Sequence, residues 1–181
     1  MIAACVKWVA GRPEPGDERF AGVSAADQAA VEMALRHAAL LGDEVVVVTA
    51  GPPAADAVLR DALACGAARV VRIDLGTDLH LDIDIDIASA AVAAALAGVV
   101  RGAAFVWCGD YSTDRGSGSV PAFLAAELGA RQALGVVAVS LGDGTTLEAT
   151  RRLDGGRREV LAVTAPAVLS VEGAAARQRR A

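Results

Sequence analysis

Short apolar runs alternate with longer helical patterns along most of this 181-residue chain, and this alternation limits the fold more than any single motif does. The run at 44–49 contains four consecutive valines, which is typical of a central parallel strand buried on both faces. Further strands are predicted at 1–9, 69–73 and 103–108, with helices from Ser24, from Pro53 to Cys65 and from Val120 to Leu128. Because the helices connect successive strands, the pattern predicts a parallel sheet with helices packed on it.

Residues 81–87 alternate Leu or Ile with aspartate and fit two structures. As a strand, the segment would place Asp82, Asp84 and Asp86 on one face. As the start of an Ala-rich helix that continues to about Arg101, it would place them in the first turns, where the helix dipole favours negative charge. We favour the helix, because its length suits a crossover between parallel strands. Solvent-facing charges then explain the aspartates better than a metal cluster does.

The end of the chain has a different pattern. Two predicted strands lie at 136–140 and 167–171, and between them segments 146–153 and 157–164 flank the turn Asp154-Gly155-Gly156 as a β-hairpin. The expected fold is therefore a single α/β domain over residues 1–181. It is a doubly wound, mostly parallel sheet with helices on both faces and a late hairpin, as in Rossmann-like nucleotide-binding proteins.

Composition and charge limit the other functional classes. Hydrophobic residues make up 54% of the chain but aromatic residues only 3%, so the core must be built from Ala, Val and Leu. The chain has a net charge of −5, yet the residues from Arg151 onward include seven arginines and three acids. Because the aromatic side chains typical of single-strand nucleic-acid binding are missing, we expect 173–181 to be a mobile basic tail or a partner contact. No apolar run approaches the roughly 20 residues of a membrane span and no signal peptide is recognisable, which predicts a cytoplasmic protein.

Neither the cysteines nor the histidines form a recognisable catalytic or metal motif. Cys5, Cys65 and Cys108 are widely spaced and odd in number, which favours buried free thiols over a disulfide framework or a zinc site. His37 and His80 are interpreted as surface histidines, because no Ser or Cys occupies a nucleophile elbow. We therefore expect no self-contained catalytic activity.

A loop rich in glycine and hydroxyl side chains, residues 109–121, joins a predicted strand to the following helix. Backbone N–H groups near Gly116 and Gly118, together with the helix N-terminus, would attract phosphate oxygens. The hydroxyls of Ser117 and Ser119 would add donors. The loop matches neither the Walker A pattern nor G-x-G-x-x-G, and a plain turn would account for it equally well.

Two other strand ends favour the phosphate-binding interpretation. The carboxyl ends of parallel strands share one edge of the sheet, so residues 5–7 and 49–51 are expected beside Cys108 and Gly109. Small residues at these positions leave room for a base and a sugar. Lys7 would contact a phosphate or a flavin, or would only cap its strand. Together the strand ends predict a nucleotide site at this edge.

Six short motifs follow one another along the chain. They are Cys-Val-Lys-x-Val at 5–9, Ala-Val-Glu-x-Ala-Leu-Arg at 30–36, Val-Val-Thr-Ala-Gly-Pro at 47–52, Ala-Leu-Ala-x-Gly-Ala-x-Arg at 62–69, Ser-Thr-Asp-x-Gly-x-Gly-x-Val-Pro at 112–121 and Leu-Asp-Gly-Gly-Arg at 153–157. No single motif is diagnostic. Their joint order and spacing, from about residue 2 to residue 172, resemble the β subunits of electron-transfer flavoproteins.

The resemblance implies a heterodimer with an α subunit, in which FAD carries out the redox chemistry and dehydrogenases donate the electrons. This chain would hold AMP or, as in electron-bifurcating members, a second FAD. Transferred by position, Cys5 would line the adenosine pocket, whereas Ser24, Asp27 and Ala50 would border the base and ribose. The phosphates would be enclosed by the loop, at Gly109, Thr113, Asp114, Gly116, Ser117, Gly118, Ser119 and Val120.

The sequence departs from the family pattern in two places. Many relatives have Asn-Pro-Phe followed by Asp-Glu where residues 24–28 stand here, so Asp27 is the polar contact that remains on the base side. Relatives usually continue for tens of residues into an arm that reaches the α subunit, so we expect a divergent or shortened subunit. Two other classes stay open. One is a stand-alone adenine-nucleotide-binding regulatory or scaffold module; the other is a small ATP-hydrolysing or adenylating enzyme that would use Asp110 and Asp114 to bind a metal ion.

Overall fold

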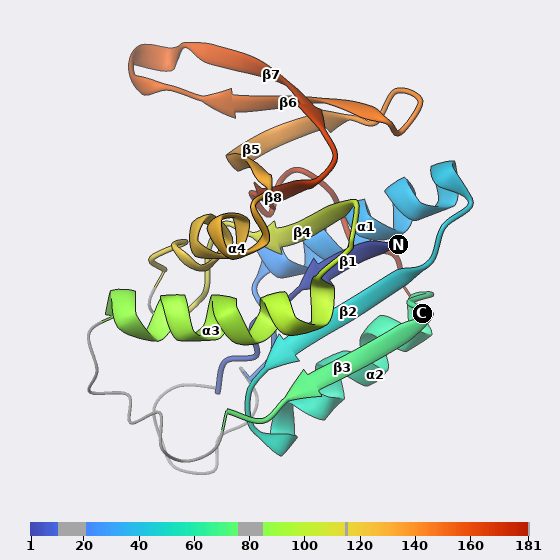
Figure 1. Ribbon diagram of the computed structural model, residues 1–181, viewed down its shortest axis with the longest axis vertical. Coiled ribbons are helices and arrows are strands. Elements are labelled where there is room, and N and C mark those ends of the chain that lie inside the picture. Colours follow the sequence, from blue (N-terminus) through green and yellow to red (C-terminus); the bar gives the residue numbers. More distant parts are fainter. Residues whose placement is uncertain (11–20, 76–84, 115, 181) are drawn as a thin grey trace.

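The computed structural model describes residues 1–10, 21–75, 85–114 and 116–180. These residues form an eight-stranded sheet with helices packed on both faces (Figure 1). The strands are β1 Ile2–Cys5, β2 Val45–Ala50, β3 Arg69–Ile73, β4 Phe105–Gly109, β5 Arg131–Ser140, β6 Thr146–Arg152, β7 Arg158–Thr164 and β8 Ala167–Val171. The α-helices are α1 Ala25–Leu41, α2 Asp56–Ala64, α3 Ile85–Val100 and α4 Val120–Leu128.

The strands lie in the order β3-β2-β1-β4-β8-β5-β6-β7. β1 pairs in parallel with both β2 and β4, and parallel pairing continues outward to β3, β8 and β5. β5, β6 and β7 pair antiparallel and extend beyond the helical layers (Figure 1). The predicted fold, a doubly wound and mostly parallel sheet with a late hairpin, is confirmed.

Alternate residues of the central strands face opposite helical layers, as the two-residue period of a strand requires. In β1, Ile2 and Ala4 belong to the cluster that contains α1 and α2 side chains. Ala3 and Cys5 belong to the cluster that contains α3 and α4 side chains. All of β1 is buried, as is β2 up to Thr49, which explains why their sequences are continuously apolar.

Local capping signals set the bounds of the helices. The Ser24 hydroxyl accepts a hydrogen bond from the Asp27 N–H at 3.0 Å, and α1 ends at Gly42, whose left-handed φ of +64° suits glycine. α4 has the predicted bounds. The helix predicted from Pro53 is divided into a 3₁₀ turn, Pro53–Ala55, followed by α2.

Residues 85–100 form a helix, which confirms the helical interpretation over the part that the structure describes. His80, Asp82, Asp84 and Arg115 lie outside the residues that the structure describes. β5 begins at Arg131 rather than at 136. The reason is Gly135, which adopts a φ of +66° where the β5–β8 register shifts, and which donates its N–H to the Ser170 hydroxyl at 2.9 Å.

His37 is fully buried, so its interpretation as a surface histidine was wrong. Its ring centroid lies 4.6 Å from that of Phe105, and its Nε2 donates to the Gly144 carbonyl at 2.8 Å. Burial lowers the pKa of His37. The turn between β5 and β6, which contains Gly144, covers this part of α1, and no local pattern indicates that contact.

The basic tail lies against α1. Arg179 donates to both carboxylate oxygens of Glu32, through Nε at 2.9 Å and Nη2 at 3.2 Å, and Arg36 binds the same carboxylate at 2.7 Å. With these partners Glu32 is only 3% exposed. The mobility of the tail stays a prediction, but its described residues have defined partners.

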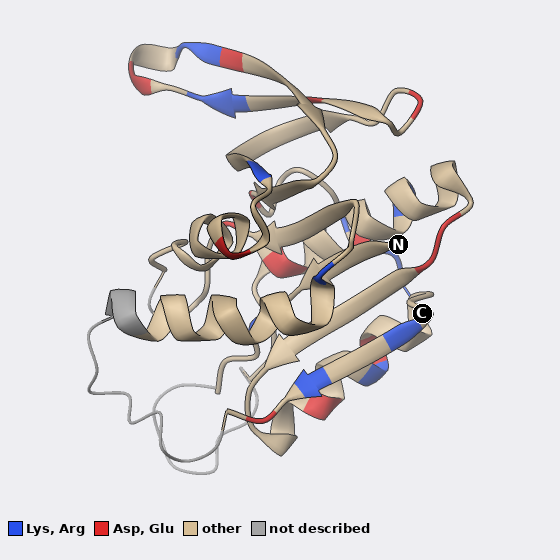
Figure 2. Cartoon of the chain, in the orientation of Figure 1, with Lys and Arg blue, Asp and Glu red and all other residues tan. Residues whose placement is uncertain are grey.

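Many charged residues lie toward the margins of the fold, whereas Asp27 and Glu32 of α1 are buried. Figure 2 shows basic and acidic positions on β3, α2 and the outer hairpin, whereas α3 beyond its first turn has none. In the hairpin, Arg151 pairs with Glu159, and Arg152 pairs with Glu172 at 2.6 Å. Among the described helices, none is both long and apolar enough to cross a lipid bilayer.

Candidate functional site

The carboxyl ends of β1, β2 and β4 meet at one edge of the sheet. Cys5 is the register partner of Val48 in β2 and of Cys108 in β4. From β1 the strand order runs outward to β2 and β3 on one side, and to β4 and β8 on the other. The order therefore reverses between β1 and β4, and open α/β sheets bind ligands at such a reversal. The structure confirms that the three predicted strand ends converge.

Asp27 is a buried carboxyl group at this edge, with 4% of its surface exposed. It accepts hydrogen bonds from the Ser24 hydroxyl at 3.1 Å and from the Lys7 N–H at 3.3 Å, and Gly109 at the end of β4 lies against it. Burial outweighs these hydrogen bonds and raises the pKa of Asp27 to about 6. Asp27 thus joins the first turn of α1 to the ends of β1 and β4.

Gly109 is required by the close approach of β4 to α1. A Cβ atom at this position would lie 2.6 Å from Asp27 Oδ1 and 2.7 Å from the Asp27 backbone nitrogen. Such distances are too short for any side chain. The glycine therefore permits the close approach of β4 to Asp27 immediately before the loop begins.

Lys7 and Asp114 connect the end of β1 with the loop after β4. The Lys7 Nζ lies 2.6 Å from Asp114 Oδ2, with both side chains partly exposed. The ammonium group of Lys7 is therefore held on the solvent-exposed side of this strand edge. Thr113 precedes Asp114 in the same loop and is exposed, and Ala50 lies half-buried at the end of β2.

Two glycines shape the loop itself. Gly116 and Gly118 adopt φ angles of +63° and +60°, which side chains other than glycine rarely tolerate. The Gly116 N–H donates to the Ser112 hydroxyl at 3.3 Å. A Cβ on Gly118 would lie 2.6 Å from the Asp110 carbonyl oxygen. Left-handed residues that alternate with residues of negative φ can turn successive backbone N–H groups toward one side, which is the geometry of anion-binding loops.

A chain of hydroxyl groups links this loop to α3. Ser117 and Ser119 lie 3.1 Å apart at their Oγ atoms, and Ser119 donates to Ser89 at 2.9 Å. Ser89 is buried and was not predicted as a site residue, because nothing in the sequence connects positions thirty residues apart. Ser119 precedes α4, but its side chain does not cap that helix. Because α4 begins at Val120, directly after Ser119, the N-terminus of this helix lies at the end of the loop.

Residues 18–180 match the family model described as the electron transfer flavoprotein domain. The chain belongs to the electron transfer flavoprotein family. Proteins of this family are electron carriers associated with flavin. A search of curated proteins found no match. The mostly parallel sheet and its flanking helices agree with the fold of an electron transfer flavoprotein domain.

In this electron transfer flavoprotein domain, the predicted residues gather at one strand edge with one partial exception. Cys5, Lys7, Asp27 and Gly109 lie at the ends of β1 and β4, and the loop extends from them toward α4. Ala50 lies two strands from β4, at the end of β2. The part of the chain that the structure describes contains no group of three or more His, Cys, Asp or Glu arranged to hold a metal ion.

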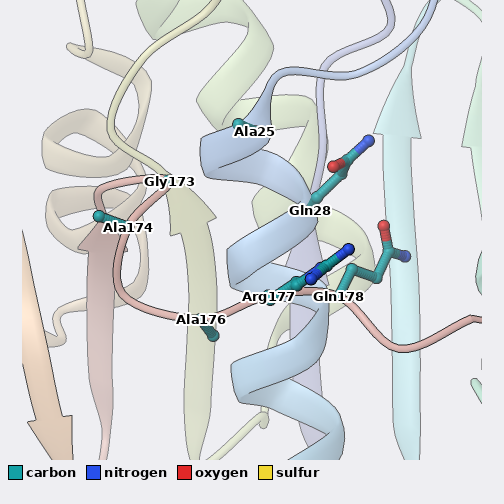
Figure 3. A pocket seen from close by; sticks show the side chains of 7 residues that line it. All are labelled: Ala25, Gln28, Gly173, Ala174, Ala176, Arg177 and Gln178. Carbon is teal, nitrogen blue, oxygen red and sulfur yellow. The ribbon is translucent and has the colours of Figure 1, made fainter.

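A separate pocket of about 330 Å³ lies between α1 and the tail (Figure 3). The side chains of Gln28, Arg177 and Gln178 lie along it, and Gly173 closes it near the start of α1. It is lined by alanine, glutamine and arginine side chains and by none of the predicted site residues. Its position on the outer side of α1 makes it distinct from the strand edge.

Proposed function

We propose that this chain is the β-type, nucleotide-holding subunit of a heterodimeric electron-transfer flavoprotein. In this role it binds AMP or a second FAD at the β1–β4 strand edge and pairs with an α subunit that holds the catalytic FAD. Dehydrogenases supply the electrons, and the complex works in the cytoplasm. The chain contributes binding and assembly rather than a bond-forming reaction of its own.

One observation carries the proposal: the loop after β4 is fixed to the end of β1 at the reversal of strand order. Asp27 accepts a hydrogen bond from the Lys7 N–H and lies against Gly109, and Lys7 pairs with Asp114. These contacts place a glycine-rich loop, a cation and a helix N-terminus at the position where nucleotide-binding α/β proteins hold phosphates.

The donors present fit an adenine nucleotide. Ser117 and Ser119 supply hydroxyls, Lys7 supplies an ammonium group, and the loop glycines leave the backbone accessible. In this assignment Gly109, Thr113, Asp114 and residues 116–120 enclose the phosphates. Ser24, Asp27 and Ala50 border the base and ribose, and Cys5 lines the adenosine pocket.

AMP and FAD share the adenosine monophosphate portion that this site would recognise. A bound FAD would supply one- and two-electron redox chemistry, whereas AMP would be a structural ligand. The residues described here act identically in both cases. They orient the adenosine end and neutralise phosphate charge.

The test is to purify the chain alone and together with an α subunit of this family, and to identify the released ligand by mass spectrometry. We expect AMP or FAD in both preparations and flavin absorbance near about 450 nm in the complex. The variants Lys7→Met and Ser119→Ala should retain less nucleotide. Ser140→Ala, an exposed serine at the end of β5, is the matched control and should retain the wild-type amount.

The outcomes separate the remaining candidates. A complex without flavin would contradict the electron-carrier role. Tight nucleotide binding without a stable α complex would instead support a stand-alone nucleotide-binding module. Full nucleotide retention by both site variants would show that the nucleotide lies elsewhere.

A further inference from the structure

Two thiols lie side by side beneath the candidate nucleotide site. Cys5 ends β1 and Cys108 precedes the last residue of β4, and the two are register partners in neighbouring parallel strands. Both side chains belong to the same core cluster, on the α3 and α4 face, and they are 6% and 4% exposed. Cys65 is remote from this pair, beside the tail residues Gln178 and Arg179.

The backbone spacing permits a covalent bond between these sulfur atoms. Neighbouring strands lie about 4.8 Å apart, and disulfides form across Cα separations of about 4.4–6.8 Å. Register partners in a parallel pair project to the same side of the sheet, so neither strand has to rotate. The separation of the two cysteines in sequence is large, which is why the spacing of cysteines along the chain did not reveal the pair.

We propose that Cys5 and Cys108 are a redox-modification site, in which a small oxidant converts the thiol pair into a reversible intrachain disulfide. Each thiol loses one proton and one electron, and one S–S bond forms. A hydroperoxide takes up both protons and both electrons, its O–O bond breaks, and it is reduced to an alcohol and water. Dithiol reductants reverse the reaction.

The geometry also predicts that this disulfide is easily reduced. Neighbouring strands lie about 4.8 Å apart, whereas a relaxed disulfide brings the two Cβ atoms to about 3.8 Å. The strands must therefore approach each other, and strained disulfides are the more readily reduced ones. The hydrogen bond with Cys5 and burial raise the pKa of Cys108, so oxidation accelerates as the pH increases.

The disulfide would act directly on the candidate site. Lys7, whose N–H binds Asp27, and Gly109, which lies against Asp27, follow the two cysteines closely in sequence. Movement of the two strand ends therefore changes the hydrogen bonds of Asp27. We expect several-fold weaker AMP binding after oxidation, a consequence that rests on the proposed function.

The experiment uses the full chain and reads out the bond itself, independently of any nucleotide. Folded protein is treated with hydrogen peroxide or diamide, free thiols are blocked with N-ethylmaleimide, and the protein is digested with trypsin. Cleavage after Lys7, Arg101 and Arg115 places Cys5 in peptide 1–7 and Cys108 in peptide 102–115. Cys65 lies in peptide 61–69, after Arg60.

We expect a linked species of peptides 1–7 and 102–115, two hydrogens lighter than their sum, which disappears after dithiothreitol. Cys65→Ser should form the same species to the same extent, because it leaves the pair intact. The proposal is overturned if the folded protein keeps both thiols free at an oxidant dose that links them in urea-unfolded protein. It is also overturned if Cys65 is the main disulfide partner. Loss of AMP binding after oxidation without the linked peptides would contradict the proposed disulfide. It would not contradict the proposal that AMP binds at the strand edge.

Discussion

Helix α1 buries two carboxyl groups in opposite ways. Asp27, in its first turn, accepts hydrogen bonds from the uncharged Ser24 hydroxyl and from backbone N–H groups, and burial raises its pKa to about 6. Glu32 lies farther along the helix, where burial also acts against its charge. There the hydrogen bonds from Arg179 and Arg36 outweigh burial and lower its pKa.

The difference separates a responsive region from a fixed one. The charge of Glu32 is neutralised by two arginines, so the tail contact is complete without a ligand. The charge of Asp27 is opposed only by dipoles, so the strand edge changes its proton content near neutral pH and can respond to a neighbouring phosphate. The same helix thus holds the tail at its middle and a titratable group at its N-terminus.

The largest effect is expected from Gly109→Ala, which forces Asp27 away from β4. The added Cβ would lie 2.6 Å from Asp27 Oδ1 and would also meet the α1 backbone. Neither the buried carboxyl nor the helix backbone can move aside without a large cost in free energy. We expect the free energy of unfolding to fall by about 3 kcal/mol, as in other overpacked cores. Urea unfolding provides the measurement.

The matched control is Gly98→Ala in the last turn of α3. Nothing lies within 4 Å of a Cβ at Gly98, and alanine favours a helix over glycine by about 0.5–1 kcal/mol. This variant should be slightly more stable than wild type. Equal losses in both variants would show that Gly109 is not constrained by Asp27.

The second prediction concerns the opposite pH dependence of the two acids. The folded pKa of Asp27 exceeds its unfolded value of about 3.9, so its contribution to stability is fully present below that pH and is lost as the pH rises through about 6. The free energy of unfolding of wild type relative to that of Asp27→Asn should therefore decrease by about 2 kcal/mol from pH 4 to pH 7.

Glu32→Gln should show the reverse trend. Because the folded pKa of Glu32 is lowered, its contribution is present above its unfolded pKa of about 4.3 and is lost as the pH falls. Urea unfolding of the three proteins across this pH range gives both trends. If the difference in unfolding free energy between wild type and Asp27→Asn does not change with pH, the contrast between Asp27 and Glu32 is contradicted.

The third prediction removes one of the arginines at Glu32. Arg179→Ala leaves the buried carboxylate with Arg36 alone, and a hydrogen bond to a charged group contributes about 1.5–3 kcal/mol. Because Arg179 is partly exposed, we expect a loss toward the lower end, about 1.5 kcal/mol, with a higher pKa for Glu32 by NMR. Arg180→Ala, next to it and exposed, should change neither quantity. An unchanged Glu32 pKa in Arg179→Ala would contradict the account of the tail contact.

The smallest effect on stability is expected for Lys7→Met. The Lys7–Asp114 ion pair is partly exposed, and such pairs contribute about 0.5 kcal/mol, less at high salt. Nucleotide retention should nevertheless fall, because the ammonium group lies at the mouth of the strand edge. A variant that is markedly less stable yet binds nucleotide normally would assign Lys7 a structural role only.

Sequence predicted the elements whose signals are local. The cap at Ser24, the valines of β2 and the glycine-rich turn before α4 gave the positions of these elements because hydrogen-bonding and periodicity act over a few residues. The candidate loop was located for the same reason. Its anchor, Asp27, was recognised through the resemblance to a family rather than through its burial.

The contacts that sequence missed join distant segments. Glu32 meets Arg179 across 147 positions, and His37 meets Gly144 across 107. Ser89 enters the candidate site only because α3 packs beside α4. No local pattern encodes such contacts, since each depends on how whole elements are placed around the sheet.

The position of the nucleotide site can be tested most directly by titrating AMP into the isotopically labelled chain and following its backbone amide resonances. The account predicts that the largest shifts occur at Lys7, Gly109 and Gly116, with little change at Gln28 and Gln178 in the pocket beside the tail. Shifts centred on that pocket, or none at the strand edge at saturating AMP, would contradict it.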